Sequence, residues 1–112
     1  MPTHAELSSR LLMDAAEFFK TLAEQNEDIK EQMAENAGVF EQMAGLIADD
    51  PQAVINDKSH GELAGKLLGD AAVFFRTLAE QNEAIRNQMI QNAEVYEQIG
   101  DLVKTNPLGV MD

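Results

Sequence analysis

The sequence contains two copies of one pattern, and this repetition constrains the fold more than any other feature. When the chain is aligned with itself so that His4 pairs with His60, about half of the paired positions are identical. Residues 18–27 and 74–83 differ only where Lys20 pairs with Arg76. Two copies are too few for a solenoid of helical repeats, which needs at least about three. We therefore expect a single domain of two internal repeats, residues 1–56 and 57–112, that bury each other's apolar surface.

Apolar residues in each repeat recur every three or four positions, which is the spacing of an amphipathic helix. In the first repeat this pattern comprises Leu7, Leu11, Ala15, Phe18, Leu22, Ile29, Met33, Ala37, Phe40, Met43 and Ile47. A second apolar row beside the first half makes the stripe broad, as in helices that pack against more than one neighbour. The pattern predicts an all-α four-helix bundle of two tandem αα-hairpins, with helices over residues 4–25, 27–48, 60–81 and 83–104.

This architecture requires the chain to turn at Asn26 and Asn82. Gln25 and Asn26 stand where the apolar stripe should continue, and Asn is a favoured helix cap. Neither Gly nor Pro lies nearby, however, and the apolar spacing runs from Leu22 to Ile29 without a shift. We expect the turn, because periodic helices much longer than about 25 residues are uncommon in small domains. The alternative is two long helices that form a hairpin and dimerise.

The connection between the repeats is marked by Pro51, which lacks a backbone donor and disfavours helix in the preceding residue. Residues 51–59 are therefore expected to form a linker. Apolar residues lie in this linker and at the matching positions of the tail. We expect them to close the end of the bundle, and the alternative is a hook that docks on a partner. They are Val54, Ile55, Val110 and Met111.

Composition excludes several classes of function. The net charge of −12 repels nucleic-acid backbones and anionic lipid surfaces. The absence of cysteine excludes disulfides and thiolate metal sites. No run approaches the ~18 apolar residues of a membrane span, and residues 1–6 lack the basic and apolar regions of a signal peptide. We expect a cytoplasmic protein that binds no nucleic acid.

Motifs for catalysis or metal binding are sparse. A carboxylate-bridged metal pair in a helical bundle needs Glu-x-x-His motifs, and the sequence has none. His4 and His60 lie at the expected helix starts, away from the middle of the bundle. The serines lie outside the Gly-x-Ser-x-Gly context of a nucleophile elbow, and there is no Gly-rich phosphate loop. We therefore expect no enzyme activity and no cofactor.

Two carboxylates, Asp14 and Asp70, occupy the edge of the apolar stripe. Burial there would raise the pKa of either group, as it does in some active sites. Ionised carboxylates are rarely fully buried, so we expect these residues to reach solvent or to pair with Arg10 or Lys66.

These features favour a non-catalytic protein-interaction module with a scaffold or regulatory role. Its partner would be another protein, for which a basic surface suits the acidic charge, or a second copy in a homodimer. The candidate partner-binding residues form polar clusters at the expected hairpin tips: Glu24, Gln25, Asn26, Glu27, Glu80, Gln81, Asn82 and Glu83. One alternative is a bundle that binds a small ligand, or a metal through carboxylates. A second is an amphipathic protein on lipid or granule surfaces, which the acidic charge disfavours.

Overall fold

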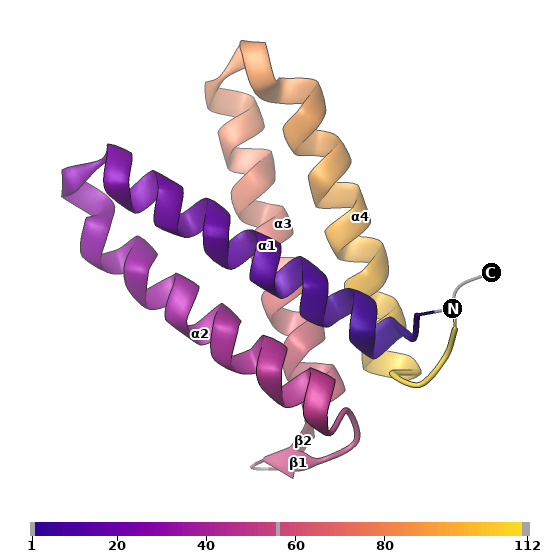
Figure 1. The fold of residues 1–112 in the computed structure, drawn as a ribbon. Coiled ribbons are helices and arrows are strands. Elements are labelled where there is room, and N and C mark those ends of the chain that lie inside the picture. The colour runs from indigo at the N-terminus through magenta and orange to yellow at the C-terminus, as the bar shows by residue number, and fades with distance from the viewer. Residues whose placement is uncertain (1, 56, 111–112) are drawn as a thin grey trace.

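The computed structural model describes residues 2–55 and 57–110, and most of them lie in four α-helices (Figure 1). These are α1 (His4–Gln25), α2 (Lys30–Asp49), α3 (His60–Gln81) and α4 (Arg86–Thr105). Helices α1 and α2 form one antiparallel hairpin, and α3 and α4 form the other. The predicted all-α four-helix bundle is confirmed, and the alternative of two long helices is wrong. The division into two repeats stays a prediction.

The two hairpins cross each other instead of lying fully side by side. Their tips diverge, while the ends near the linker and the tail lie close together (Figure 1). Packing between the hairpins involves α1 against α3 and α4, and α2 against α3. Each helix therefore contributes one side to its own hairpin and another to the interface, as the broad apolar stripe predicts.

The chain turns at Asn26, but α2 begins later than predicted. Residues Glu27–Ile29 form a short 3₁₀ helix, η1, and Glu83–Ile85 form η2 at the matching place. The expected side-chain cap on the second helix is wrong, because the Asn26 amide donates instead to the Leu22 carbonyl at 3.3 Å. The backbone carbonyl of Asn26 accepts from the Ile29 N–H at 3.2 Å. This tighter turn delays the start of α2 by three residues and makes the connection without Gly or Pro.

A chain of aromatic rings forms the centre of the interface. Phe18 and Phe19 of α1 interleave with Phe74 and Phe75 of α3, with ring centroids 5.4 Å apart for Phe19–Phe74 and 5.5 Å for Phe18–Phe75. Both contacts are edge-to-face, the arrangement that the charge distribution of aromatic rings favours. The chain extends within each hairpin to Phe40 of α2 and Tyr96 of α4. These rings therefore connect all four helices.

The starts of α1 and α3 are held by a histidine each. The Nδ1 atom of His4 lies 2.8 Å from the Asn106 carbonyl oxygen, and that of His60 lies 2.7 Å from the Asp50 carbonyl oxygen. A carbonyl only accepts, so each Nδ1 donates. Both histidines are buried, and each ties a helix start to the end of the other hairpin. The role of His4 and His60 is thus to join helix ends.

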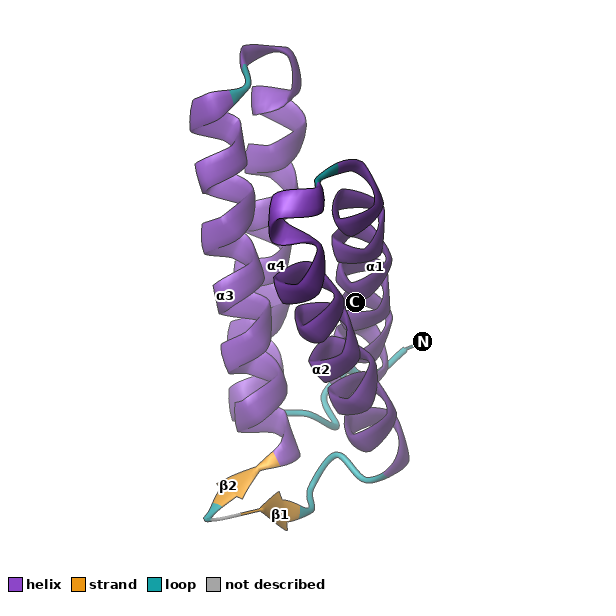
Figure 2. Ribbon diagram, turned by 90° about the vertical axis from the view of Figure 1, so that its left-hand side faces the viewer, coloured by secondary structure: helices purple, strands orange, loops and turns teal. Residues whose placement is uncertain are grey.

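The ends of the bundle are closed by backbone hydrogen bonds. The linker contains a small antiparallel pair of strands, β1 (Val54–Ile55) and β2 (Lys58–Ser59) (Figure 2). Val54 and Val110 were expected to close the end of the bundle, but their side chains are 64% and 49% exposed and do not do so. The His60 N–H instead donates to Ala53 and the Ala5 N–H to Pro107. The side chain of Ile55 and the whole of Met111 lie outside the described residues.

Helices α3 and α4 approach each other closely near the linker, at Gly65 and Gly100. A Cβ atom added at Gly65 would lie 2.7 Å from the Gly100 carbonyl oxygen and 2.9 Å from Cε of Lys104. The aligned positions of the first hairpin are Ser9 and Ala44, where the serine hydroxyl donates to the Ala44 carbonyl at 2.9 Å. Glycine at position 65 therefore makes room for the α4 backbone and for the Lys104 side chain.

We expect Gly65→Ala to lower the free energy of unfolding by about 1–3 kcal/mol, because the added methyl group meets a fixed carbonyl. Gly69→Ala in the same helix is the matched control, since nothing lies within 4 Å of its added Cβ. It should raise the free energy of unfolding by about 0.5–1 kcal/mol through helix propensity. Urea denaturation followed by circular dichroism measures both. Equal effects of the two substitutions would contradict the close approach.

Candidate functional site

The predicted partner-binding clusters lie at the two hairpin tips. All of Glu24–Glu27 and Glu80–Glu83 are exposed, as expected from the turn. Because the tips diverge, the two clusters are not brought together into one surface (Figure 1). Their role in binding a partner stays a prediction, and each would act as a separate acidic contact.

The two carboxylates at the stripe edge are also exposed. Lys66 Nζ lies 3.5 Å from Asp70 Oδ2, one helical turn away, so the predicted pairing of Asp70 is confirmed. Asp14 is exposed as well, and it borders a hollow that contains Tyr96. The exposed ion pair between Lys66 and Asp70 contributes little to stability.

A carboxylate metal site and a membrane span are two features that can be sought in the structure. Within residues 2–55 and 57–110, no group of three or more His, Asp or Glu side chains is placed to hold a metal ion. In the same part of the chain, no helix is both long enough and apolar enough to cross a bilayer.

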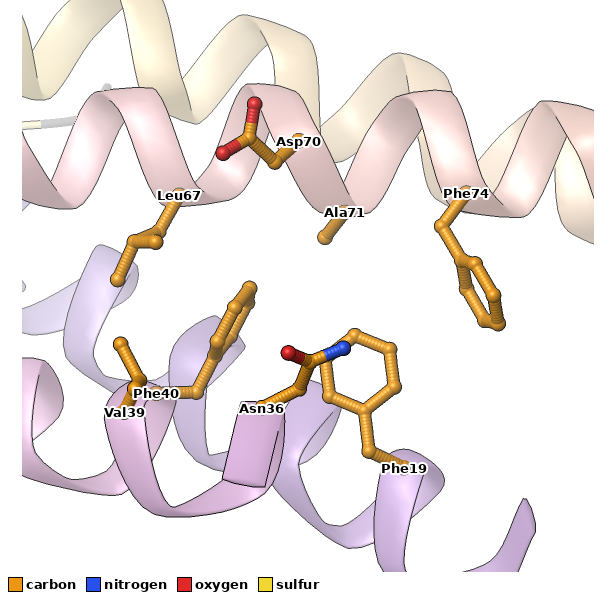
Figure 3. A pocket seen from close by; sticks show the side chains of 8 residues that line it. All are labelled: Phe19, Asn36, Val39, Phe40, Leu67, Asp70, Ala71 and Phe74. Atoms are coloured by element: carbon orange, nitrogen blue, oxygen red, sulfur yellow. The ribbon is translucent and has the colours of Figure 1, made fainter. Parts of the chain in front are cut away.

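Two similar hollows lie where the hairpins cross. The first, of about 260 Å³, is lined by Phe19, Asn36, Val39, Phe40, Leu67, Asp70, Ala71 and Phe74. Figure 3 shows Asn36 and Phe40 reaching toward α3, while the Asp70 carboxylate points away from the hollow. The second hollow, of about 300 Å³, is lined by Leu11, Asp14, Phe18, Phe75, Gln88, Met89, Asn92, Val95 and Tyr96. Most of these residues match those of the first hollow in the aligned repeats.

A larger apolar hollow of about 410 Å³ continues from the first along α2 and α3. Its lining consists of Val39, Gln42, Met43, Leu46, Lys58, Leu63, Lys66 and Leu67. Val39 and Leu67 line both hollows, which makes them one surface. We call the larger hollow the α2–α3 groove. Its four residues on α2 follow the spacing i, i+3, i+4 and i+7, so the apolar wall runs along two helical turns, or about 10 Å.

One end of the α2–α3 groove is basic. Lys58, Lys66 and Lys104 line an adjoining hollow of about 260 Å³ together with Glu62 and Leu63. These three lysines come from β2, α3 and α4, and they are three of the eight Lys and Arg residues of the chain. The aligned positions of the other repeat hold Pro2, Arg10 and Ala48. The basic end is therefore a difference between the two halves of the sequence.

Sequence reasoning missed the α2–α3 groove. Its lysines lie 46 residues apart from first to last (104 minus 58), and no spacing rule connects them. The fold places them together because α4 returns past α3 at Gly65. One signal was available in the sequence, because Val39 is an apolar residue outside the apolar stripe of α2. In the structure its side chain is 52% exposed.

Tyr96 in the second hollow ties α4 to the other hairpin. Its hydroxyl donates to the Leu11 carbonyl of α1 at 2.9 Å. Burial raises the pKa of this phenol well above its usual range, and the Asp14 carboxylate raises it further. Phe40 occupies the aligned position in α2 and has no such group. The hydroxyl of Tyr96 is therefore a neutral, structural hydrogen-bond donor.

The raised pKa makes the stability of the fold depend on pH. The folded chain holds the phenol proton more tightly than the unfolded chain does. The protonated phenol therefore adds to the free energy of unfolding below about pH 10, and this stabilisation is lost as pH rises toward the raised pKa. Because Tyr96 is the only tyrosine, the near-ultraviolet absorbance of phenolate reports it directly. We expect Tyr96 in the folded chain to titrate at a pH above the ordinary pKa of tyrosine. The Tyr96→Phe variant should lose less stability at alkaline pH than the unchanged protein does. Titration at the ordinary pKa would contradict this account.

The α2–α3 groove offers apolar contact with charged groups at its rim, which suits the binding of another molecule. Its polar side chains are an amide and amines that can orient what binds. Comparison with known proteins provides no further assignment: no protein-family model matches the chain, and neither a curated protein nor a solved structure matches it.

Proposed function

We propose that this chain is a non-catalytic protein-interaction module and that the α2–α3 groove is its binding surface. The observation that carries the proposal is the groove itself, a continuous apolar hollow between two helices that leaves Val39 half exposed. Removing apolar surface of this kind from water lowers the free energy by roughly 25 cal/mol per Å². An exposed apolar groove with a polar rim is a common form of interaction site.

The charge of the chain supports a protein partner over other classes of ligand. The net charge of −12 opposes binding to nucleic acids and to anionic lipid surfaces. It also opposes close contact between two copies of the chain, so a partner other than a second copy is favoured. The acidic tips at Glu24–Glu27 and Glu80–Glu83 would add long-range attraction for a partner with basic surface.

The proposal predicts that partner contacts concentrate at Val39. We would incorporate a photo-crosslinking amino acid at position 39 and, as the matched control, at position 95, whose valine is 47% exposed on α4. Irradiation in cells of the source organism should yield a discrete adduct with another protein from position 39 and none from position 95. Adducts of equal yield at both positions, or none at position 39, would contradict the proposal.

A further inference from the structure

We propose that the occupant of the α2–α3 groove is an amphipathic helix of a partner protein, with acidic residues in its first turn. Its apolar face would lie along the groove, and its acidic first turn would meet Lys58, Lys66 and Lys104. This inference rests on the proposed function and specifies the chemistry of the partner.

The shape of the groove fits a helix. Apolar side chains project from two neighbouring helices, with Val39, Met43 and Leu46 on α2 and Leu63 and Leu67 on α3. Two helices packed against each other leave a furrow between them, and a third helix can place its own row of side chains there. Two turns of groove, about 10 Å, match apolar residues at positions i, i+3 or i+4, and i+7 of the incoming helix.

The openness of the groove favours a helix over an acyl chain. Small-molecule sites commonly enclose roughly 70–90% of the surface of the ligand. The α2–α3 groove is a furrow of about 410 Å³ that faces solvent along its length, so a bound acyl chain would keep much of its apolar surface in water. An amphipathic helix needs cover on one face only, because its other face is polar.

The charges along the groove set the direction of the helix. Lys58, Lys66 and Lys104 lie at the end next to the linker, and Asn36 lies in the first hollow, beyond the other end. Lys66 forms an ion pair with Asp70. Neither Lys58 nor Lys104 forms an ion pair within the described part of the chain. Acidic residues are favourable in the first turn of a helix, so the partner helix should begin at the lysines.

The same charges limit the rest of the partner. A segment that is acidic throughout would be repelled by the −12 net charge of this chain. Carboxylates are favourable only where they meet the three lysines, which outnumber the one carboxylate there, Glu62. A second copy of the chain is equally acidic and is disfavoured as an occupant for that reason.

The test uses a synthetic helical peptide and the full chain. The fluorescein-labelled peptide has about 14 residues, with Glu residues in its first turn, Leu at i, i+3 and i+7, and Lys in its last turn. Its binding is measured by fluorescence anisotropy at low and moderate salt, beside a peptide in which Gln replaces Glu. Palmitate serves as a competitor, and sedimentation equilibrium of the chain alone measures self-association.

We expect saturable binding of the Glu peptide that weakens with salt. Val39→Gln should weaken it about tenfold, from the loss of one buried valine contact. Val95→Gln, the matched control, should leave it within about twofold. Lys58→Gln and Lys104→Gln should each weaken the Glu peptide about three- to fivefold and leave the Gln peptide unchanged. Both valines and both lysines are exposed, so these variants should fold.

Four results would overturn the inference: no saturable binding, equal affinity for the Glu and Gln peptides, equal effects at positions 39 and 95, or stoichiometric displacement of the peptide by palmitate. Self-association that Val39→Gln abolishes would overturn it too, since a second copy would then fill the groove. If the peptide fails while photo-crosslinking at position 39 captures a protein, the proposed function stands and only the helix is wrong. Failure of both experiments removes both proposals.

Discussion

The edge-to-face contacts between the phenylalanines of α1 and α3 are the interaction on which the arrangement of this protein depends. Phe18 and Phe19 project from one hairpin and pack against Phe74 and Phe75 of the other. Interleaving the four rings fixes where the hairpins cross. The crossing leaves a hollow on either side of the ring cluster, and on the α2 side this hollow continues into the α2–α3 groove.

The ends near the linker are fixed by a different kind of contact. His60 is hydrogen bonded to Asp50, and His4 to Asn106, so each buried imidazole joins the start of one helix to the end of another. Helix ends leave backbone groups without partners, and these bonds satisfy some of them inside the protein. The aromatic rings thus set the crossing, the histidines hold the ends, and the free tips diverge. Lys58, Lys66 and Lys104 meet at the held end.

Sequence patterns predicted the helices of this fold but not its candidate site. The apolar spacing of Leu11, Phe18 and Leu22 follows from the helical period alone and does not depend on how the helices pack. It therefore located the helices and the turn. The first turn of α2 was mispredicted, because the Asn26 side chain bonds backward to Leu22 instead of capping forward. Val54 was expected to close the end of the bundle because it is apolar, but backbone hydrogen bonds close that end and leave its side chain exposed. The groove depends on how α2 of one hairpin lies against α3 of the other, and residue spacing does not encode that arrangement.

The contact between the start and the end of the described chain has a topological consequence. Thr3 pairs with Val110 in a β-bridge, and Ala5 bonds to Pro107, so the first and last segments already behave as neighbouring strands. The linker makes a similar junction between α2 and α3. A short loop joining the present ends, with new ends opened near Asp57, would therefore exchange the order of the hairpins while keeping every helix pairing. In this sense the described fold is a ring of two hairpins that meet at two similar junctions.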